Sequence, residues 1–323
     1  MSPLSYPDLL ALPGIGVYLE RVEARLAADV GWAGGATSAT AAETLAAGGK
    51  RLRPLLVLLS SPVAGQERED LVRAGSAVEL VHMATLVHDD VLDHAAMRRG
   101  HPTVWAKHGD RIAGATGDFL FARAFAVLAE TGDLESLVLL SQAALGLSEG
   151  EALQMLQTRE PLTTTEQYFE RCTLKTGRLF AAACGLGGRL GGLADADADA
   201  LADYGRLLGL AFQVADDILD CDGSSAATGK TLGTDLIGGT ATLPLLLAAR
   251  DDAEVAAALR SEPAPGDVLG LLNRVVATGA LDEARDAARN LVRSAEEALD
   301  RIQGDLDTAP LRSVVRGVVD RDT

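Results

Sequence analysis

Apolar residues recur three and four positions apart through long stretches of the chain, with polar residues between them. This spacing is the period of an α-helix, and it predicts helices over residues 71–92, 112–128, 134–156 and 201–219. Several of these segments are apolar on more than one face, which is typical of helices buried inside a bundle. Alternating patterns of β-branched residues are nearly absent, so the sequence predicts an all-α helical bundle.

Glycine and proline interrupt the helical pattern at places where we expect helices to stop. These interruptions lie at 48–50, 98–102, 159–161, 187–192 and 222–230. The stretch LADADADALADYG fits a helix start, with Asp195 or Asp197 near its N-terminus. No repeat of about 20–50 residues and no linker occurs, so we expect one domain over residues 1–323. The segment from Asp251 onward is amphipathic and acidic and carries no motif with recognisable chemistry.

Composition narrows the class of protein. Hydrophobic residues make up 48% of the chain and charged residues 23%, which is typical of a folded protein with a large core. The net charge of −17 argues against a nucleic-acid partner, because such partners select basic surfaces. The three cysteines have no metal-ligand spacing, so we expect buried, reduced thiols in a cytoplasmic protein. No signal peptide is expected, and no apolar run approaches the ~20 residues of a membrane span.

Two aspartate clusters stand at the ends of apolar helical segments, HDDVLD at 88–93 and ADDILD at 215–220. Asp89 and Asp93 lie one helical turn apart, and so do Asp216 and Asp220. Carboxylates placed in this way repel each other and are costly to desolvate, and a divalent cation resolves both problems. Mg²⁺ commonly uses one or two carboxylates together with water and substrate phosphates, so we expect magnesium at both clusters.

Other metals fit the sequence less well. Calcium loops need a glycine-bearing twelve-residue spacing, and di-iron bundles need Glu-x-x-His pairs; both are missing. The five histidines fall between His82 and His108 at intervals of six or seven residues, with no cysteine near them. Such intervals do not stack imidazoles on one helix face, which argues against zinc.

Basic residues form a second recurring element among these carboxylates. They occur in GGKRLRP at 48–54, in RRG at 98–100, in KTGRLF at 175–180 and in TGKTLGTD at 228–235. A single basic residue is more often a solvated surface charge. Several of them in an acidic protein, close to expected magnesium sites, favour two pockets for diphosphate groups, because arginine and lysine are the usual partners of phosphate oxygens.

These motifs occur in an order that closely resembles the polyprenyl synthetase family, the all-trans isoprenyl diphosphate synthases. The resemblance covers roughly residues 45–245 and includes GGKRLRP, ELVHMATLVHDDVLD, RRGHPT, GDFLFARAF, EGEALQM, KTGRLF, AFQVADDILD and GKTLGTDL. It implies an isoprenoid synthase bundle around a deep central cavity, a homodimer, and three magnesium ions for which manganese can substitute. The substrates it implies are isopentenyl diphosphate and an allylic diphosphate.

The resemblance also implies roles for individual residues. Asp89 and Asp93 would bind two magnesium ions, and Asp216 the third, supported by Asp217 and Asp220 directly or through water. The allylic diphosphate would be held by Arg98, Lys175 and Lys230. The isopentenyl diphosphate would be held by Lys50, Arg53, His82 and Arg99. Gln213 and Thr176 would line the reacting centre, where an allylic cation forms as diphosphate departs and no side-chain nucleophile is needed.

Thr240 is a departure from the family pattern. Many members read GKxTLP after the second cluster, whereas this chain reads GGTATLP, with Thr240 in the place of the lysine. We expect weaker diphosphate or magnesium binding from this change, without loss of activity. An inactive subunit of a hetero-oligomer is the alternative. A terpene cyclase is a further alternative, but GGKRLRP and the second aspartate cluster both argue against it.

Product length is expected to depend on the residues that precede Asp89. If the growing chain lies back along this helix, Thr85 and Ala84, then Val81, then Ala77 would line its path. Short-chain members of the family place bulky aromatic residues four or five positions before the first aspartate. Thr85 and Ala84 are small, which favours a long product of about 30 to 50 carbons. A short-chain farnesyl or geranylgeranyl diphosphate synthase is the alternative.

Overall fold

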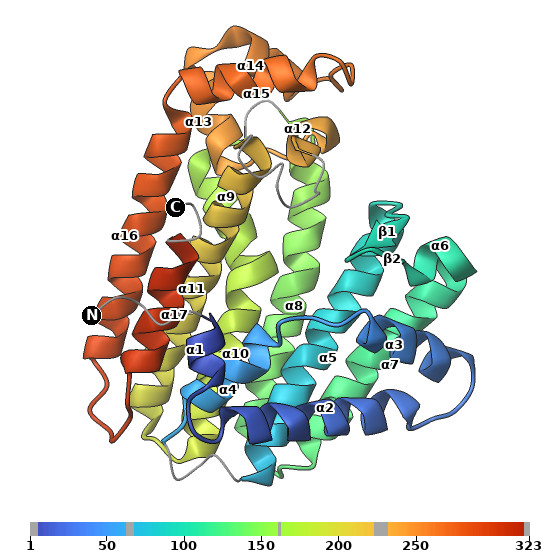
Figure 1. Ribbon diagram of the computed structural model, residues 1–323, viewed down its shortest axis with the longest axis vertical. Coiled ribbons are helices and arrows are strands. Elements are labelled where there is room, and N and C mark those ends of the chain that lie inside the picture. Colours follow the sequence, from blue (N-terminus) through green and yellow to red (C-terminus); the bar gives the residue numbers. More distant parts are fainter. Residues whose placement is uncertain (1–5, 63–67, 161–162, 223–231, 320–323) are drawn as a thin grey trace.

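The computed structural model describes residues 6–62, 68–160, 163–222 and 232–319, and this part of the chain is almost wholly helical (Figure 1). Its two strands, β1 (Met97–Arg98) and β2 (His101–Pro102), form one short antiparallel hairpin. The all-α prediction is therefore confirmed. The N-terminal helices are α1 (Tyr6–Leu10), α2 (Ile15–Gly31), α3 (Ala36–Ala46), α4 (Leu52–Leu59), α5 (Glu69–Leu92), α6 (Val104–His108), α7 (Asp110–Ala129) and α8 (Leu134–Gln157).

The second half of the chain continues the bundle and adds a small helical cap. Its helices are α9 (Thr165–Cys172), the π-helix η2 (Thr173–Gly177), α10 (Arg178–Gly191), α11 (Asp195–Cys221), α12 (Thr234–Gly238), α13 (Leu243–Asp251), α14 (Ala253–Ala258), α15 (Val268–Ala277), α16 (Ala280–Asp300) and α17 (Ala309–Val319). The acidic C-terminal segment thus packs as helices, with α16 lying along α11 and α14 and α15 above the bundle (Figure 1).

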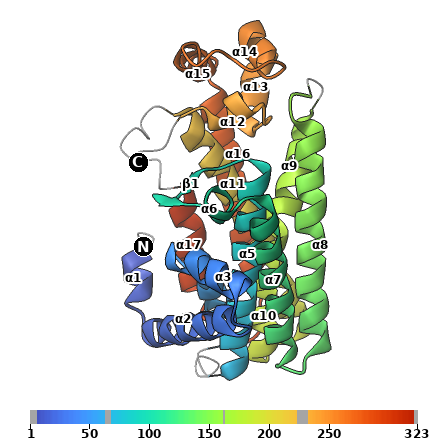
Figure 2. The same cartoon turned by 90° about the vertical axis from the view of Figure 1, so that its right-hand side faces the viewer.

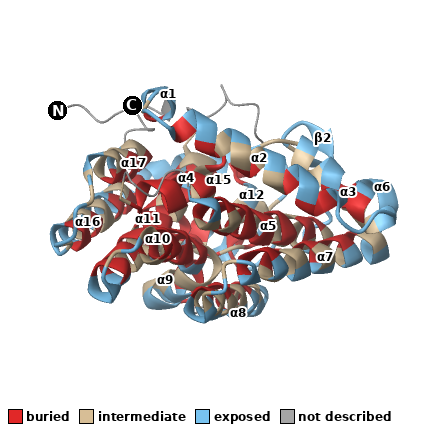
Figure 3. Cartoon of the chain, turned by 90° about the horizontal axis from the view of Figure 1, so that it is seen from below, coloured by how far each residue is buried: buried red, intermediate tan, exposed pale blue. Residues whose placement is uncertain are grey.

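The four segments that the helical period predicts, at 71–92, 112–128, 134–156 and 201–219, correspond to α5, α7, α8 and α11. In the bundle α5 packs against both α7 and α10, and α10 packs against α11, so these helices form its centre. Figure 2 shows α7 and α8 side by side along one flank, and Figure 3 shows buried residues concentrated on α5, α10 and α11. The helix start expected at Asp195 or Asp197 is confirmed, because α11 begins at Asp195.

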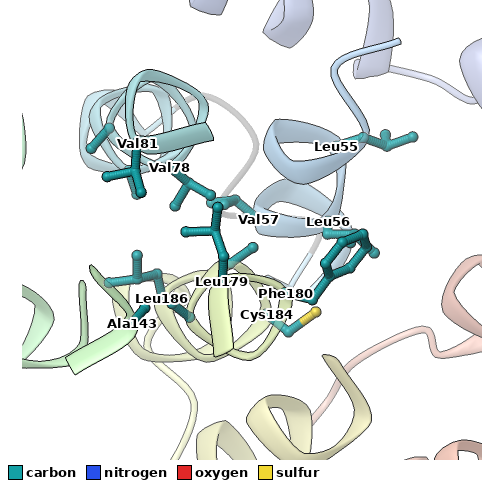
Figure 4. Packing of buried hydrophobic residues seen from close by; sticks show 14 of the residues in the cluster. Leu55, Leu56, Val57, Val78, Val81, Ala143, Leu179, Phe180, Cys184 and Leu186 are labelled. Atoms are coloured by element: carbon teal, nitrogen blue, oxygen red, sulfur yellow. The ribbon is translucent and has the colours of Figure 1, made fainter. Parts of the chain in front are cut away.

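The core behind the aspartate clusters is built from aliphatic side chains of three helices. Val57 from α4, Val78 and Val81 from α5, and Leu179 and Leu186 from α10 converge there (Figure 4). Each is almost completely excluded from solvent. Full burial of one such side chain stabilises a fold by about 1.5–3 kcal/mol, so this layer fixes the spacing between α5 and α10.

The glycines of GGRLGG end a helix, as expected, and also shape its packing. The sequence predicts a helix stop at 187–192, and α10 ends at Gly191, where Gly192 closes it with a left-handed backbone (φ 90°). A Cβ at Gly187 would lie 2.2 Å from the carbonyl oxygen of Val57, and one at Gly188 would lie 2.7 Å from Leu201 Cδ1. These glycines therefore let α10 approach α4 and α11 closely.

Two further expectations concern cysteines and membranes. Cys172, Cys184 and Cys221 are free and buried, as expected. Among the described residues one helix, α7, is long and apolar enough to cross a membrane by length and composition, and 39% of its most apolar 18-residue window is buried. A core helix of a bundle passes the same test, and α7 packs against α5 and α8.

Candidate active site

The first aspartate cluster lies at the C-terminal end of α5. Asp93 caps the helix, and its backbone N–H donates to the Asp89 carbonyl at 2.8 Å, so Asp89 and Asp93 project from the same end. Burial, together with the nearby carboxylates of Glu151 and Asp93, raises the pKa of Asp89 to about 6, although the charge of Lys175 acts in the opposite direction. Burial also raises the pKa of Asp93. Two carboxylates held in this state gain stability from an added cation.

Lys175 reaches the same place from the π-helix η2. Its Nζ forms an ion pair with Glu151 of α8, and both residues line the same cavity as Asp89. The approach of η2 to α8 depends on Gly150, because a Cβ there would lie 2.7 Å from the Lys175 backbone nitrogen. Wide helical turns of this kind are rare and occur often at functional sites.

Asp89, Glu151 and Lys175 surround the mouth of a cavity of about 410 Å³ between α5, α7, α8 and η2. The rest of its lining is mostly apolar and includes Val91, Leu92, Phe121, Ala144 and Leu147. Ala144 lies two helical turns before Glu151, about 10 Å deeper along α8. Phe121 lies two turns beyond Gly114 along α7 and stacks on His88 with ring centroids 5.8 Å apart. Ala144 and Phe121 therefore form the floor of the cavity.

The residues expected to control product length separate into two groups. Thr85 lines the cavity one turn below Asp89. Ala84, Val81 and Ala77 are completely buried in the packing between helices and are not part of the cavity lining. An effect of these three residues on product length stays a prediction, and it would have to act through the packing of α5.

The second aspartate cluster, on α11, presents its carboxylates in different ways. Asp216 is exposed at the surface of the helix. Asp217 is buried, and its Oδ1 and Oδ2 accept hydrogen bonds from Gln213 Nε2 at 2.8 Å and Tyr168 Oη at 2.7 Å. Asp220 caps α12, accepting from the backbone N–H groups of Thr234 and Asp235 at 3.1 and 3.0 Å. Asp217 and Asp220 thus accept hydrogen bonds from protein groups, whereas Asp216 is exposed, and a supporting role for the first two at a metal site stays a prediction.

Gln213 and Thr176 lie together, as expected for residues of one reacting centre. Thr176 Oγ1 donates to Gln213 Oε1 at 3.0 Å, while the amide nitrogen of Gln213 donates to Asp217. Asp217 in turn accepts from Tyr168, so the amide of Gln213 has one orientation. Free lone pairs on the Thr176 and Gln213 oxygens remain for a positively charged partner.

The basic residues of GGKRLRP gather around His82 and the hairpin. Arg53 lies with its guanidinium carbon 4.6 Å above the Phe180 ring, and within the described residues its buried Nε has no hydrogen-bond partner. Burial lowers the pKa of Arg53 to about 10, with Arg99 acting in the same direction. Burial and the neighbouring arginines hold the pKa of His82 well below its usual value. A neutral imidazole beside crowded cations is suited to an anion with several oxygens.

The backbone around this cationic group is shaped by glycine. Arg51 begins α4 in a left-handed conformation (φ 50°) and pairs with Glu23 at 2.5 Å and Glu79 at 3.0 Å. Lys50 precedes it in the same turn. A Cβ at Gly49 would lie 2.7 Å from Arg99 Nη1, and that nitrogen also donates to the Gly48 carbonyl. Glycine at this position therefore permits the contact between the turn and Arg99.

Sequence reasoning assigned no role to several residues that the structure brings into the site. Asp90 is buried and accepts a hydrogen bond from Arg98 Nε at 2.7 Å, which holds the hairpin arginine against α5. Glu151 pairs with Lys175, and Tyr168 fixes Asp217. Glu151 and Asp90 stand inside the EGEALQM and HDDVLD motifs, but their partners come from other elements. Lys230 lies outside the described residues.

The donor set fits a divalent cation that also binds substrate. Among the residues that the structure describes, no group of three His, Cys, Asp or Glu side chains is close enough to hold a metal alone. Magnesium rarely needs such a cage, since it completes its octahedron with water and phosphate oxygens. The carboxylates of Asp89 and Asp93 at the end of α5, and of Asp216 on α11, are hard oxygen donors of the type that magnesium prefers.

Comparison with known proteins gives a consistent result. The family model of polyprenyl synthetase matches residues 36–268. Octaprenyl diphosphate synthase of Escherichia coli is 37% identical over 276 residues, covering 84% of each chain, and geranylgeranyl diphosphate synthase of Methanosarcina mazei is 35% identical over 260 residues, covering 79% of this chain and 80% of the relative. The crystal structure of a decaprenyl diphosphate synthase from Rhodobacter capsulatus superposes with a TM-score of 0.89 at 32% identity, covering 98% of this chain and 99% of that one. The chain therefore belongs to the polyprenyl synthetase family and is a trans-prenyltransferase with the all-α isoprenoid synthase fold.

Proposed function

We propose that this chain, as one domain of 323 residues, condenses isopentenyl diphosphate with an allylic diphosphate in the cytoplasm and makes an all-trans polyprenyl diphosphate of about 30 to 50 carbons. The observation that carries the proposal is the meeting of Asp89, Glu151 and Lys175 at the mouth of an apolar cavity. A charged mouth suits a diphosphate, and an apolar interior suits the hydrocarbon attached to it.

Three magnesium ions would be held by Asp89 and Asp93 on α5 and by Asp216 on α11, with Asp217 and Asp220 as indirect supports; manganese can replace magnesium. Bound divalent ions supply electrostatic stabilisation of the departing diphosphate. The allylic diphosphate, bound to these ions, would also be held by the cationic side chains of Lys175, Arg98 and Lys230. The ion pair of Lys175 with Glu151 keeps this cation beside Asp89 before substrate arrives.

The isopentenyl diphosphate would occupy the cationic group of Lys50, Arg53, His82 and Arg99. The unpartnered Nε of Arg53 and the crowding of positive charge around His82 favour an anion there. Condensation breaks the C–O bond to the allylic diphosphate and forms a C–C bond to the isopentenyl double bond. Thr176 and Gln213 direct oxygen lone pairs at the allylic cation, and a proton then leaves from the new intermediate to the released diphosphate.

The proposed product length rests on the small side chain of Thr85 in the cavity lining and on the long-chain relatives. An apolar protein cavity of about 150 Å³ holds one benzene ring, so about 410 Å³ holds roughly 16 carbons. A longer chain therefore has to pass the floor at Phe121 and Ala144. If the floor stays closed, the product has about 15 to 20 carbons, as in the geranylgeranyl relative.

We also propose that two copies of the chain form a homodimer through α8. Leu134, Val138, Leu145 and Leu156 are 46–75% exposed, and their spacing of four, seven and eleven residues places them on one face of the helix. Exposed apolar residues gathered on one helix face are typical of an interface. Leu145→Arg should convert the dimer to a monomer in light scattering, whereas Leu269→Arg, at an exposed leucine on α15, should leave it unchanged.

The proposed reaction can be tested directly. The purified chain is incubated with Mg²⁺, isopentenyl diphosphate and farnesyl diphosphate, and the products are dephosphorylated and separated by chromatography. We expect a ladder that ends at about 30 to 50 carbons, and no product with EDTA. Complete absence of elongated product under every metal condition would favour the non-catalytic subunit, and a cyclic hydrocarbon would favour the cyclase.

A further inference from the structure

Arg51 is the one basic residue of GGKRLRP that has no proposed role in binding substrate. It stands at the start of α4, is only 8% exposed, and its guanidinium pairs with two carboxylates. Its Nε pairs with Glu23 of α2 at 2.5 Å, and its Nη1 pairs with Glu79 of α5 at 3.0 Å. Because α2, α4 and α5 pack against one another, Arg51 links all three helices beside the proposed isopentenyl diphosphate pocket.

The backbone of Arg51 has a conformation that residues with a Cβ rarely adopt. Its φ of 50° and ψ of 36° lie in the left-handed region. Such a conformation persists where surrounding contacts fix it, and the two ion pairs supply contacts of this kind. The positive charge of Arg51 is therefore already matched before any substrate binds.

Glu79 is the buried carboxylate among these cations. It is only 3% exposed, whereas 45% of the Glu23 side chain is exposed. Glu79 lies one helical turn before His82, so α5 presents both side chains on one face. Burial lowers the pKa of Arg53 and of Arg99, and the charge of Glu79 opposes this shift in both. The negative charge of Glu79 therefore reaches these two arginines as well as its ion-pair partner.

The other two arginines of the group have no carboxylate of their own. Within the described parts of the chain, the ion pairs of this group belong to Arg51, and Arg53 and Arg99 have none. The buried Nε of Arg53 has no hydrogen-bond partner there, and Arg99 donates to the neutral carbonyl of Gly48. A Cβ at Gly49 would lie 2.7 Å from Arg99 Nη1 and 3.1 Å from Arg51 Nη1, so both guanidinium groups close around the same glycine. Two unmatched charges thus stand beside one matched charge.

We infer that Arg51 is a positioning residue, and that its pairing with Glu79 keeps the neighbouring arginines available to substrate. A buried carboxylate without a partner is costly, so Glu79 would turn to another cation if Arg51 were removed. The remaining arginines of the group are Arg53 and Arg99. Glu79 would then compete with the substrate for them. The inference rests on the proposed function for the identity of that substrate, isopentenyl diphosphate.

The test removes the charge of Arg51 and then the carboxylate that it holds. Arg51→Met keeps much of the side-chain length, and we expect the KM for isopentenyl diphosphate to rise roughly 10- to 100-fold, the range for loss of one or two charge-assisted hydrogen bonds. Turnover at saturation and the KM for the allylic substrate should change little. Adding Glu79→Gln should return the KM for isopentenyl diphosphate to within a few-fold of the unmodified value, because the competing carboxylate is gone.

Adding Glu23→Gln to Arg51→Met is the matched control. Glu23 loses the same ion pair, but water solvates its half-exposed side chain, so this second change should give no recovery. Equal KM values for the two double variants would overturn the inference, and so would an unchanged KM in Arg51→Met. A rise in KM that Glu79→Gln does not reverse would also overturn it, because Arg51 would then bind the diphosphate itself.

Binding and melting measurements decide the matter if folding or activity is lost. Binding of isopentenyl diphosphate, measured by calorimetry without Mg²⁺, should follow the same order as the KM values. If Arg51→Met does not fold, its double variant with Glu79→Gln must show a cooperative melting transition and bind as tightly as the unmodified chain; weaker binding overturns the inference. If the unmodified chain binds isopentenyl diphosphate but condenses nothing, the proposed function fails, and the order of binding still decides the role of Arg51. Absence of binding to the unmodified chain would overturn the inference.

Discussion

Product length offers the sharpest test of the cavity. The space of about 410 Å³ below Asp89 holds roughly 16 carbons, and one aromatic ring occupies the volume of about six carbons. Thr85→Phe places a ring one turn below Asp89, so about ten carbons of room remain. We expect this variant to stop at products of about 15 carbons or fewer. Phe121→Ala removes a ring from the floor and should lengthen the product by at least one five-carbon unit.

The assay separates dephosphorylated products by chain length at saturating isopentenyl diphosphate. Phe125→Ala is the matched control, since Phe125 lies one turn further along α7 and outside the cavity lining. We expect its product distribution to equal that of the unmodified chain. If Phe121→Ala and Phe125→Ala give the same distribution, Phe121 is not the floor. If Thr85→Phe leaves the length unchanged, the chain does not grow along α5, and the reasoning from the cavity is refuted.

Three further predictions concern charge. Asp89→Ala should lower turnover by at least about 10²-fold, because ionisation loses part of its electrostatic stabilisation; steady-state kinetics at saturating Mg²⁺ measure this, and near-normal turnover would remove Asp89 from the metal site. Arg53→Ala should raise the KM for isopentenyl diphosphate more than that for the allylic substrate, and Lys175→Ala should do the reverse; equal effects on both substrates would contradict the separation of the pockets. Because the pKa of Asp89 is raised to about 6, protons compete with Mg²⁺ below that pH, and only about a tenth of the carboxylate is ionised at pH 5. The Mg²⁺ concentration for half-maximal activity should therefore rise steeply below pH 6 and be constant above pH 7, a dependence that Asp89→Asn should abolish.

The main helices and the aspartate clusters were predictable because their signals are local. A helical period needs only neighbouring residues, and it located α5, α7, α8 and α11 within a few residues of their ends. The clusters repeat within single turns, so their carboxylates could be recognised without any tertiary information.

Contacts between distant segments could not be predicted in this way. Glu151 meets Lys175 only because Gly150 admits η2 against α8, and Asp90 holds Arg98 through a hairpin that has no strand signal in the sequence. Gly187 and Gly188 resemble a helix stop, but close packing against α4 and α11 outweighs their local preference.

The π-helix η2 allows the side chains before it and the side chains after it to point in directions that a regular helix would not allow. From Thr165 to Gly191 the chain forms one unbroken rod, in which η2 holds one residue more than an α-helical turn would. Each residue of an α-helix is rotated by about 100° about the helix axis, so the extra residue changes the direction in which all later side chains point. Leu179 and Leu186, after η2, can therefore face the hydrophobic core, while Tyr168, before η2, points towards Asp217. The extra residue of η2 therefore lets one continuous rod direct Tyr168 and Leu179 to faces that a regular α-helix would not give them.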